Sequence, residues 1–420
     1  MVQWIVASHI SFCQVQEPSF RLLLSYLTAV TTSYTAIPRC LPKSGNTVRS
    51  WTMQIFTHHR QTLISAFKDI LSVHFSFDLW VSGNHLSLLG IVGHWINKDG
   101  QACRALLGLR RLHGAHTGEN QSQVIMSLLQ EYDLTKKIGY FTLDNAQNND
   151  SALTCLAKHL QEIGVSFDVK EHRLRCIGHV INLVVKAFLY GIESDHEMPN
   201  LDEPSTFWRR QGSYGKLRNI INYICWTPQR RDEFIRLTQE SSSEDSTFQP
   251  IAANLTRWNS DFKAIKRALQ LQNGFEVFQA RHIRDGLEDD QLDTDDWKEL
   301  QDIATILEPF HRCTLELEGH RGNGVLYDLL PTMDYLLVHL ESTLQLYKAR
   351  KCSPHLLSSI TLAWRKLEKY YRLTDENIVL YAAVVLHPSM KFDYFETSWA
   401  EHPAWITSAK AKVQQLWETM

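Results

Sequence analysis

Paired cysteines are missing from this chain of 420 residues. Its eight cysteines are scattered, and no two of them form a Cys-x-x-Cys pair. Structural zinc fingers need ligands at short fixed spacings, and disulfide frameworks are typical of small secreted domains. The cysteine pattern therefore argues against both and favours a reducing compartment.

The sequence also has little net charge and no long apolar run. The chain has 43 basic and 46 acidic residues, so its overall charge does not indicate nucleic-acid binding. This balance does not exclude local basic patches. No window holds 18 uninterrupted apolar residues, which predicts the absence of a membrane span. The first residues lack a basic region and a small-residue cleavage site, so we expect no signal peptide.

Apolar residues are nevertheless abundant enough for a large core. Hydrophobic residues make up 44% and aromatic residues 10% of the chain, as is typical of globular proteins. The length suggests two or three domains. Residues 1–70 carry apolar side chains at three- and four-residue spacing, which predicts a small helical subdomain.

The next segment changes to strand-like patterns. Apolar runs occupy residues 71–80, 85–96 and 101–112. The turn sequences Ser-Gly-Asn and Asn-Lys-Asp-Gly separate them, which predicts an antiparallel meander. An amphipathic helical segment follows, and Ile138–Leu143 then predicts a buried fourth strand. This order is that of an RNase H-like fold, in which the fourth strand lies parallel beside the first.

Two aspartates lie at the ends of predicted strands. Asp78 is near the end of the first strand, and Asp144 directly follows the fourth. A lone aspartate there is most often a turn residue or a solvated polar group. In this strand order, however, both carboxylates would project from neighbouring strand ends, where they tolerate each other best when a cation such as Mg²⁺ lies between them. We therefore expect them to share a metal ion.

A cysteine and a histidine follow the second aspartate. Either Asn149 or Asp150 could act as N-cap of the helical segment after Asp144. The apolar segment beginning at Arg173 is predicted as a buried helix on which Cys176 and His179, three residues apart, share one face. Such residues usually belong to a core, and two ligands make an incomplete zinc site. We expect this pair to be largely buried, to pack towards the acids and to hold no zinc.

From about residue 192 the pattern is mostly helical, with segments at bundle-like spacing. The acidic, polar stretches 241–246 and 285–296 are predicted as solvated linkers. The sequence therefore predicts three parts. They are an N-terminal helical subdomain at 1–70, an RNase H-like core at 71–190 and a helical region at 191–420.

Short motifs recur along nearly the whole chain in one order. They are Phe77–Trp80 with Ser82 and Asn84, Leu143–Ala146 with Asn148–Asp150, Arg173–Cys176 with Gly178-His179 and Asn182-Leu183, Thr256–Ser260, and Leu386, Pro388, Lys391, Tyr394-Phe395 and Trp399. Each motif alone is weak, but their combined order and spacing are specific. By these motifs the sequence resembles a transposase of the hAT superfamily, of the kind abundant in fungal genomes.

The resemblance implies a fold, a chemistry and a set of site residues. It implies an RNase H-like core, with a mixed five-stranded sheet and flanking helices, interrupted by a large all-helical insertion. Family members cut and paste DNA with three acids and two Mg²⁺ or Mn²⁺ ions, and they act on transposon ends in the nucleus. Asp78 and Asp144 match the first two acids, and Cys176 and His179 match a motif beside the active site. Trp258 matches a tryptophan that stacks on a flipped base.

The sequence departs from the family pattern in two places. The third acid, a glutamate in a Ser-Ala-rich stretch after the insertion, is absent before the chain ends at Met420, as is the dimerisation segment of that region. The N-terminal zinc finger of the BED type is also absent. We therefore expect a remnant, defective in strand transfer and weakened in self-association, that still binds DNA.

Two other functions stay open at this point. One is a transposase-derived protein–protein interaction module whose helical half is the useful part. The other is a nuclease that uses a different group, such as Glu171 or His172. A Lys/Arg stripe on the helical half would favour DNA binding, and an exposed apolar patch would favour the interaction module.

Overall fold

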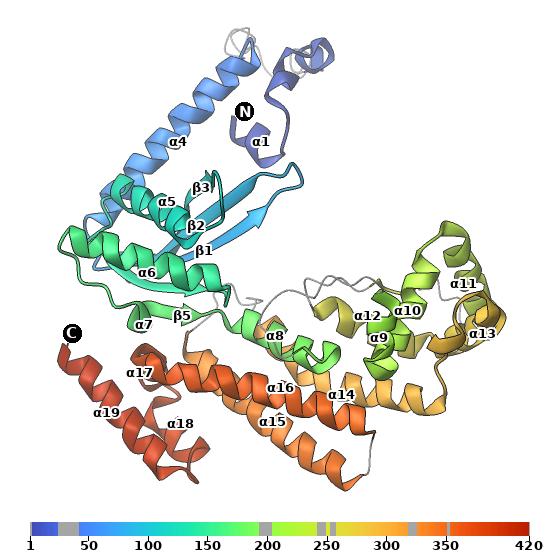
Figure 1. Ribbon diagram of the computed structural model, residues 1–420. Coiled ribbons are helices and arrows are strands. Elements are labelled where there is room, and N and C mark those ends of the chain that lie inside the picture. The colour runs from blue at the N-terminus through green and yellow to red at the C-terminus, as the bar shows by residue number, and fades with distance from the viewer. Residues whose placement is uncertain are drawn as a thin grey trace. The chain divides into compact units, whose positions relative to one another are not determined.

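The computed structural model describes residues 2–23, 42–192, 204–241, 249–252, 258–317, 326–350 and 353–419. The chain divides into two compact units (Figure 1). The first unit comprises Met1–Phe75, Leu79–Leu112 and Gln123–Gly139, and the second comprises Ser76–Asp78, His113–Ser122 and Tyr140–Met420.

A mixed five-stranded sheet occupies the region predicted as the RNase H-like core. Its strands are β1 (Val73–Val81), β2 (Ser87–Ile96), β3 (Ala102–Arg111), β4 (Ile138–Leu143) and β5 (Arg173–Arg175). Their order is β3-β2-β1-β4-β5, with β2 and β3 antiparallel and β4 and β5 parallel. The predicted meander, and the fourth strand as neighbour of the first, are confirmed.

Strand β5 corrects the sequence-based prediction of a helix that starts at Arg173. Phe141, Thr142 and Leu143 of β4 pair in parallel with the three residues of β5. Three residues are too few to show an alternating pattern, and the apolar helix that follows dominates the local periodicity. Only the pairing with β4 defines this strand.

A glycine allows β1 and β4 to approach each other. A Cβ atom added to Gly139 would lie 2.5 Å from Nδ1 of His74 and 3.1 Å from the carbonyl oxygen of Val73. The backbone amide of Val73 donates to the carbonyl oxygen of Lys137 at 2.8 Å. Any larger residue at 139 would therefore push β4 away from its neighbour.

The helices of the first unit are short except for one. They are α1 (Val2–Ala7), the 3₁₀ helix η1 (Phe12–Gln16), α4 (Gly45–Phe67) and most of α5 (Gly118–Glu131). Ser44 caps α4 by accepting a hydrogen bond from the amide of Thr47 at 3.2 Å. After α4 ends, Nζ of Lys137 donates to the carbonyl oxygens of Phe67, Lys68 and Ile70 at 2.7 to 3.0 Å, which satisfies groups that a helix end leaves open. The helical character predicted for residues 1–70 is confirmed where the structure describes them.

Helices dominate the second unit. They are α6 (Gln147–Glu162), α7 (Val169–His172), α8 (Ile177–Tyr190), α9 (Pro204–Arg209), α10 (Gly212–Cys225), α11 (Pro228–Ser241), α12 (Asn259–Gln270), α13 (Gln272–His282), η2 (Ile283–Asp285), η3 (Glu288–Asp290), α14 (Thr294–Leu317), η4 (Leu326–Asp328), α15 (Leu329–Ala349), α16 (Pro354–Leu373), η5 (Thr374–Glu376), α17 (Ile378–Leu386), α18 (Lys391–Ser398) and α19 (Pro403–Thr419). The prediction of a helical region is therefore confirmed, although most of the predicted linker 241–246 lies outside the described residues. Within the described part of the chain, no helix has the length and apolar character needed to cross a bilayer.

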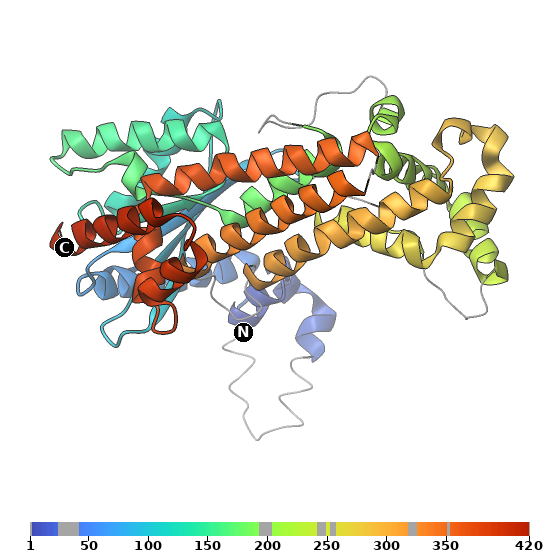
Figure 2. The same cartoon turned by 90° about the horizontal axis from the view of Figure 1, so that it is seen from below.

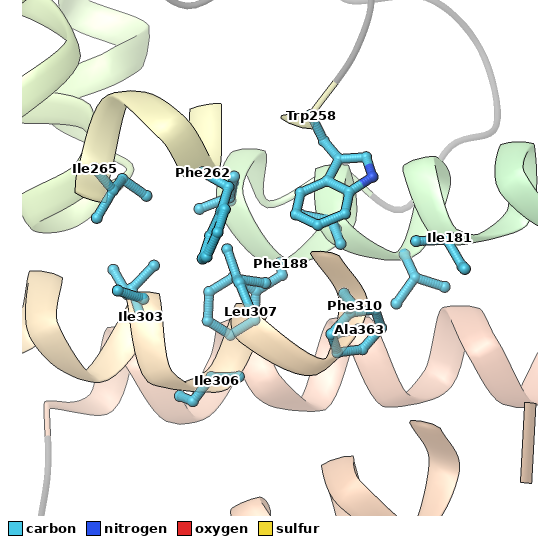
Figure 3. Packing of buried hydrophobic residues seen from close by; sticks show 14 of the residues in the cluster. Ile181, Phe188, Trp258, Phe262, Ile265, Ile303, Ile306, Leu307, Phe310 and Ala363 are labelled. Atoms are coloured by element: carbon cyan, nitrogen blue, oxygen red, sulfur yellow. The ribbon is translucent and has the colours of Figure 1, made fainter. Parts of the chain in front are cut away.

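One continuous apolar core joins these helices. Helices α14, α15 and α16 run side by side (Figures 1 and 2), and α8 packs against both α14 and α16. In Figure 3, Phe262 and Ile265 of α12 face Ile303 and Leu307 of α14. This packing buries one face of α12 and leaves its other face outside the core.

A buried ion pair lies at the centre of the helical region. The Asp261 side chain is fully buried, and its Oδ1 lies 2.8 Å from Nη1 of Arg218. The hydroxyls of Tyr190 and Tyr214 donate to the same carboxylate at 2.7 and 2.5 Å. The Arg218 guanidinium also lies 4.3 Å from the ring centroid of Trp208. These contacts tie α8, α10 and α12 together through one charged group.

Candidate functional site

Asp144 directly follows β4, and its carboxylate is held in place from one side. Its Oδ1 accepts hydrogen bonds from the amide of Ala146 at 3.0 Å and from Nδ2 of Asn149 at 2.5 Å. Helix α6 begins at Gln147 with Ala146 as N-cap, so the predicted cap at Asn149 or Asp150 is wrong. Asn149 lies within the first turn of α6, where its side chain orients the acid instead. Among the described residues, no hydrogen bond to Oδ2 of Asp144 is found, so this oxygen can accept a ligand.

Asp78 lies on β1, three residues before the strand ends at Val81. Its side chain is exposed, while Phe75 and Phe77 of the same strand are buried. Because β1 and β4 are neighbours in the sheet, their backbones run about 4.8 Å apart. The sharing of a metal ion between Asp78 and Asp144 stays a prediction.

Arg173 of β5 supports the backbone around Asp144. It is only 5% exposed, and its Nη2 donates to the carbonyl oxygen of Asp144 at 2.9 Å. Its Nε lies 2.7 Å from Oδ1 of Asp150. Burial lowers the pKa of the Arg173 guanidinium, and the charge of Asp150 acts against this shift. The sequence analysis missed this role, although an arginine within an apolar run was a usable signal.

The segment after β5 places the predicted Cys/His pair differently from expectation. The amide of Cys176 donates to the carbonyl oxygen of Leu143 at 2.8 Å, and Cys176 is the N-cap residue of α8. His179 lies in the first turn of α8. Both side chains are half-buried, so the prediction of a largely buried pair within one helix is wrong. Because the backbone is extended where β5 pairs with β4, Cys176 lies at the N-cap of α8 and not within the helix.

Arg175 provides a further link between β5 and the end of β4. Its Nη1 donates to Oδ1 of Asn145 at 2.7 Å. The Asp-Asn dipeptide therefore contacts two arginines of β5, Arg173 through the carbonyl of Asp144 and Arg175 through the side chain of Asn145. These two contacts hold the segment after β4 against β5.

Trp258 is buried. It is 2% exposed, its amide donates to Oδ1 of Asn182 at 3.2 Å, and its ring meets that of His311 edge-on at 6.1 Å. Helices α8 and α14 cover the indole in this structure, and the stacking of Trp258 on a base stays a prediction. Thr256 and Arg257 of the same motif lie outside the described residues.

A basic face lies on α12, which follows Trp258. Lys263 and Lys266 are exposed and Arg267 is half-buried, at spacings that place them on the same side of the helix. Nζ of Lys266 lies 3.5 Å from Oε2 of Glu308, but both side chains are about half exposed, so this pair neutralises little in water. This face is a local basic patch of the kind that the net charge did not exclude.

The donor chemistry around Asp144 fits one hard divalent cation. Two carboxylates are a common protein contribution to an Mg²⁺ site, since water and substrate phosphate complete its shell. Within the described ranges, no group of three or more His, Cys, Asp or Glu side chains is arranged to hold a metal ion. Binding of a cation by Asp78 and Asp144 therefore stays a prediction, and such a cation would need other ligands to complete its shell.

Comparisons with known proteins agree with this architecture. Residues 76–168 match the ZBED1 RNase-like domain, and residues 174–306 match the ZBED1 RNase-like helical domain. The first range contains both aspartates, and the second runs from β5 into the first half of α14.

Similar curated proteins come from fungi and plants. The putative transcriptional regulator tpeD of Talaromyces stipitatus is 26% identical over 99% of this chain and 46% of its own length. The putative AC transposase of Zea mays is 26% identical over 54% of this chain and 26% of its own length. The zinc finger BED domain-containing protein RICESLEEPER 2 of Oryza sativa subsp. japonica is 21% identical over 92% of this chain and 49% of its own length. The chain spans about half the length or less of these relatives. With its RNase-like core and adjoining helical domain, this chain is an hAT-family transposase-like protein.

Proposed function

We propose that this transposase-derived protein binds DNA, holds one divalent cation at Asp78 and Asp144, and does not by itself cut DNA. The observation that supports the proposal is the strand order, which makes β1, the strand of Asp78, a neighbour of β4, the strand that Asp144 follows. Relatives named as a transposase and a transcriptional regulator support DNA as the partner and the nucleus as the location.

The chain's own residues would orient the cation and the DNA backbone. Asn149 and the amide of Ala146 fix Oδ1 of Asp144, which leaves Oδ2 for the cation. Arg175 lies beside the same strand end and can contact a phosphate. A bound Mg²⁺ or Mn²⁺ would supply electrostatic stabilisation to phosphate oxygens. A mechanism with two metal ions needs more ligands than these two acids, so we expect binding without cleavage.

Binding should depend on the basic face of α12. We expect Lys263→Glu/Lys266→Glu to weaken binding to duplex DNA and to reduce the slope of log affinity against log salt by about 2, because two phosphate contacts are lost. Fluorescence anisotropy at several salt concentrations measures both quantities. The same duplex, labelled at its ends, reports nicking in Mg²⁺ or Mn²⁺.

The matched control is Lys348→Glu, which reverses an exposed charge in the last turn of α15. It should leave the affinity and the slope close to those of the unchanged protein. A loss of log affinity in Lys348→Glu about half as large as in the double variant, in proportion to its single reversed charge, would mean that net charge, not the α12 face, governs binding. Robust nicking that is lost in Asp144→Ala would contradict the proposal that the chain alone does not cut.

An interaction module is the second candidate function, and exposed apolar side chains favour it. Trp226, Leu386 and Trp417 are 80%, 71% and 74% exposed. A protein that fails to bind DNA even at low salt would support this function instead. The nuclease reading gains no support, since the His172 ring lies between Tyr140 and Phe167 and its Nδ1 contacts the carbonyl oxygen of Asp168.

A further inference from the structure

A cavity of about 430 Å³ lies among α15, α16, α18 and α19, in a part of the second unit that the family matches do not cover. This volume lies within the range of ordinary ligand pockets. Its aromatic lining consists of Trp364, Tyr371, Tyr381, Trp399 and Trp405. The C-terminal helices of this region contact one another and α15 (Figure 2).

The aromatic rings form a connected wall. Trp405 meets Trp399 edge-on at 5.7 Å and lies 6.3 Å from the ring of Tyr371. The His402 ring stacks on the Trp405 ring, with 4.2 Å between the two ring centroids. Trp405 is nevertheless 46% exposed, so its indole is accessible to a ligand while its neighbours hold it in place. Electron-rich ring faces of this kind attract cations.

Carboxylates complete the lining. The lining contains one arginine, Arg372, and four acidic residues, which are Asp334, Glu341, Glu368 and Asp375. Arg372 pairs with Glu368 at 2.5 Å and Asp375 pairs with Lys412 at 2.9 Å. Among the described residues, Glu341 has only a neutral partner, since its Oε1 accepts from Nε1 of Trp364 at 3.1 Å. One carboxylate beside an indole therefore keeps a charge that no neighbouring cation balances.

The edge of the cavity already shows how an ammonium group binds here. Nζ of Lys412 lies 4.5 Å from the ring centroid of Tyr381 and 2.9 Å from Oδ1 of Asp375. The pair of Trp364 and Glu341 repeats this combination of ring and carboxylate without a lysine. A phosphate backbone would be repelled by the same carboxylates, so the lining disfavours nucleic acid.

We propose that this cavity binds the alkylammonium group of a lysine side chain carried by a basic peptide segment of a partner protein. Glu341 provides the counter-charge, and Trp364 and Trp405 provide ring faces for the ammonium and the carbon stem. The proposal does not depend on DNA binding or on the acid pair, because the cavity involves neither.

The test uses the full chain and three peptides. A short Lys-Gly-Ser repeat peptide is titrated into the protein while tryptophan fluorescence is followed, since three tryptophans line the cavity. One comparison peptide carries norleucine for lysine, which keeps the carbon stem and removes the charge. The other carries glutamine. We expect saturable binding of the lysine peptide, weaker at high salt, and at least tenfold weaker binding of the other two.

Variants locate the site. Glu341→Gln and Trp405→Ala should each weaken lysine-peptide binding about threefold to fivefold, as is typical of ion pairs and cation–ring contacts at accessible sites. Trp417→Ala removes a more exposed tryptophan of α19 that lies outside the lining, and it should have no effect. Trp405→Phe, which keeps much of the packing, gives an intermediate loss and replaces Trp405→Ala if that variant unfolds. Absence of lysine-peptide binding, equal binding of the norleucine peptide, or unchanged affinity in Glu341→Gln and the Trp405 variants would overturn the proposal.

Discussion

Replacing Asp261 by alanine is expected to lower the free energy of unfolding by about 3–5 kcal/mol, because it leaves the charge of Arg218 buried without its partner. Arg218 is 5% exposed, and its Nη1 lies 2.8 Å from Oδ1 of the fully buried Asp261. Two tyrosine hydroxyls would lose their acceptor as well. Urea unfolding followed by circular dichroism measures the change.

A second variant separates the loss of a partner from the value of the pair. Asp261→Leu combined with Arg218→Met removes both charges and keeps apolar volume, so it should recover much of the lost stability. Asp295→Ala is the matched control, since this exposed carboxylate pairs only with exposed Lys298 and should change stability by less than about 1 kcal/mol. If Asp261→Ala cost no more than Asp295→Ala, the buried network would not hold the helical region together.

Asp334 is expected to show the second large effect. The hydroxyls of Tyr371 and Tyr394 donate to this carboxylate at 2.5 Å each, and Nε1 of Trp399 donates at 3.0 Å. Asp334→Ala would leave all three donors without an acceptor, which should cost about 2–4 kcal/mol. Asp302→Ala is a graded control, because Asp302 accepts from one tyrosine, Tyr347, and its loss should cost about 1 kcal/mol. Equal costs in the two variants would contradict the role of the three-donor cluster.

The stability contribution of Asp334 should depend on pH. Burial raises the pKa of its carboxyl above the ordinary value of 3.8, while its three donors act in the opposite direction. The pKa of Asp334 is therefore higher in the folded than in the unfolded state. Its contribution to the free energy of unfolding is then largest below the unfolded pKa and falls as the pH rises through the folded pKa. The stability difference between the unchanged protein and Asp334→Asn, measured across this interval, should therefore shrink as pH rises.

Sequence patterns predicted the elements with strong periodicity. The limits of β4 and the positions of β1 to β3 follow from alternating or compact apolar runs between turn residues, and the helical region follows from its repeated spacing. Tyr394, Phe395 and Trp399 belong to the motifs that carry the family resemblance. Tyr394 and Trp399 both donate hydrogen bonds to Asp334, which gives this part of the motif a structural role.

Other features depend on contacts between distant segments and were not predictable from local patterns. Strand β5 exists only through its pairing with β4, and this pairing moves Cys176 to the helix cap. Asn149 looked like a cap because amide side chains often cap helices, but Asp144 provides a stronger partner. The motif around Trp258 gave no sign that its indole is buried, and only the packing of α8, α12 and α14 buries it.

Divalent-cation binding tests the central claim most directly. The 420-residue chain is titrated with Mn²⁺ and the free ion is measured by electron paramagnetic resonance, which needs neither DNA nor activity. We expect one bound ion per chain, with affinity at least about tenfold lower in both Asp78→Asn and Asp144→Asn, since each removes one charged oxygen ligand. Asp133→Asn is the control, because this exposed residue precedes β4 and its φ of 56° suits asparagine. Unchanged Mn²⁺ affinity in Asp78→Asn and Asp144→Asn would contradict a shared cation site between β1 and β4.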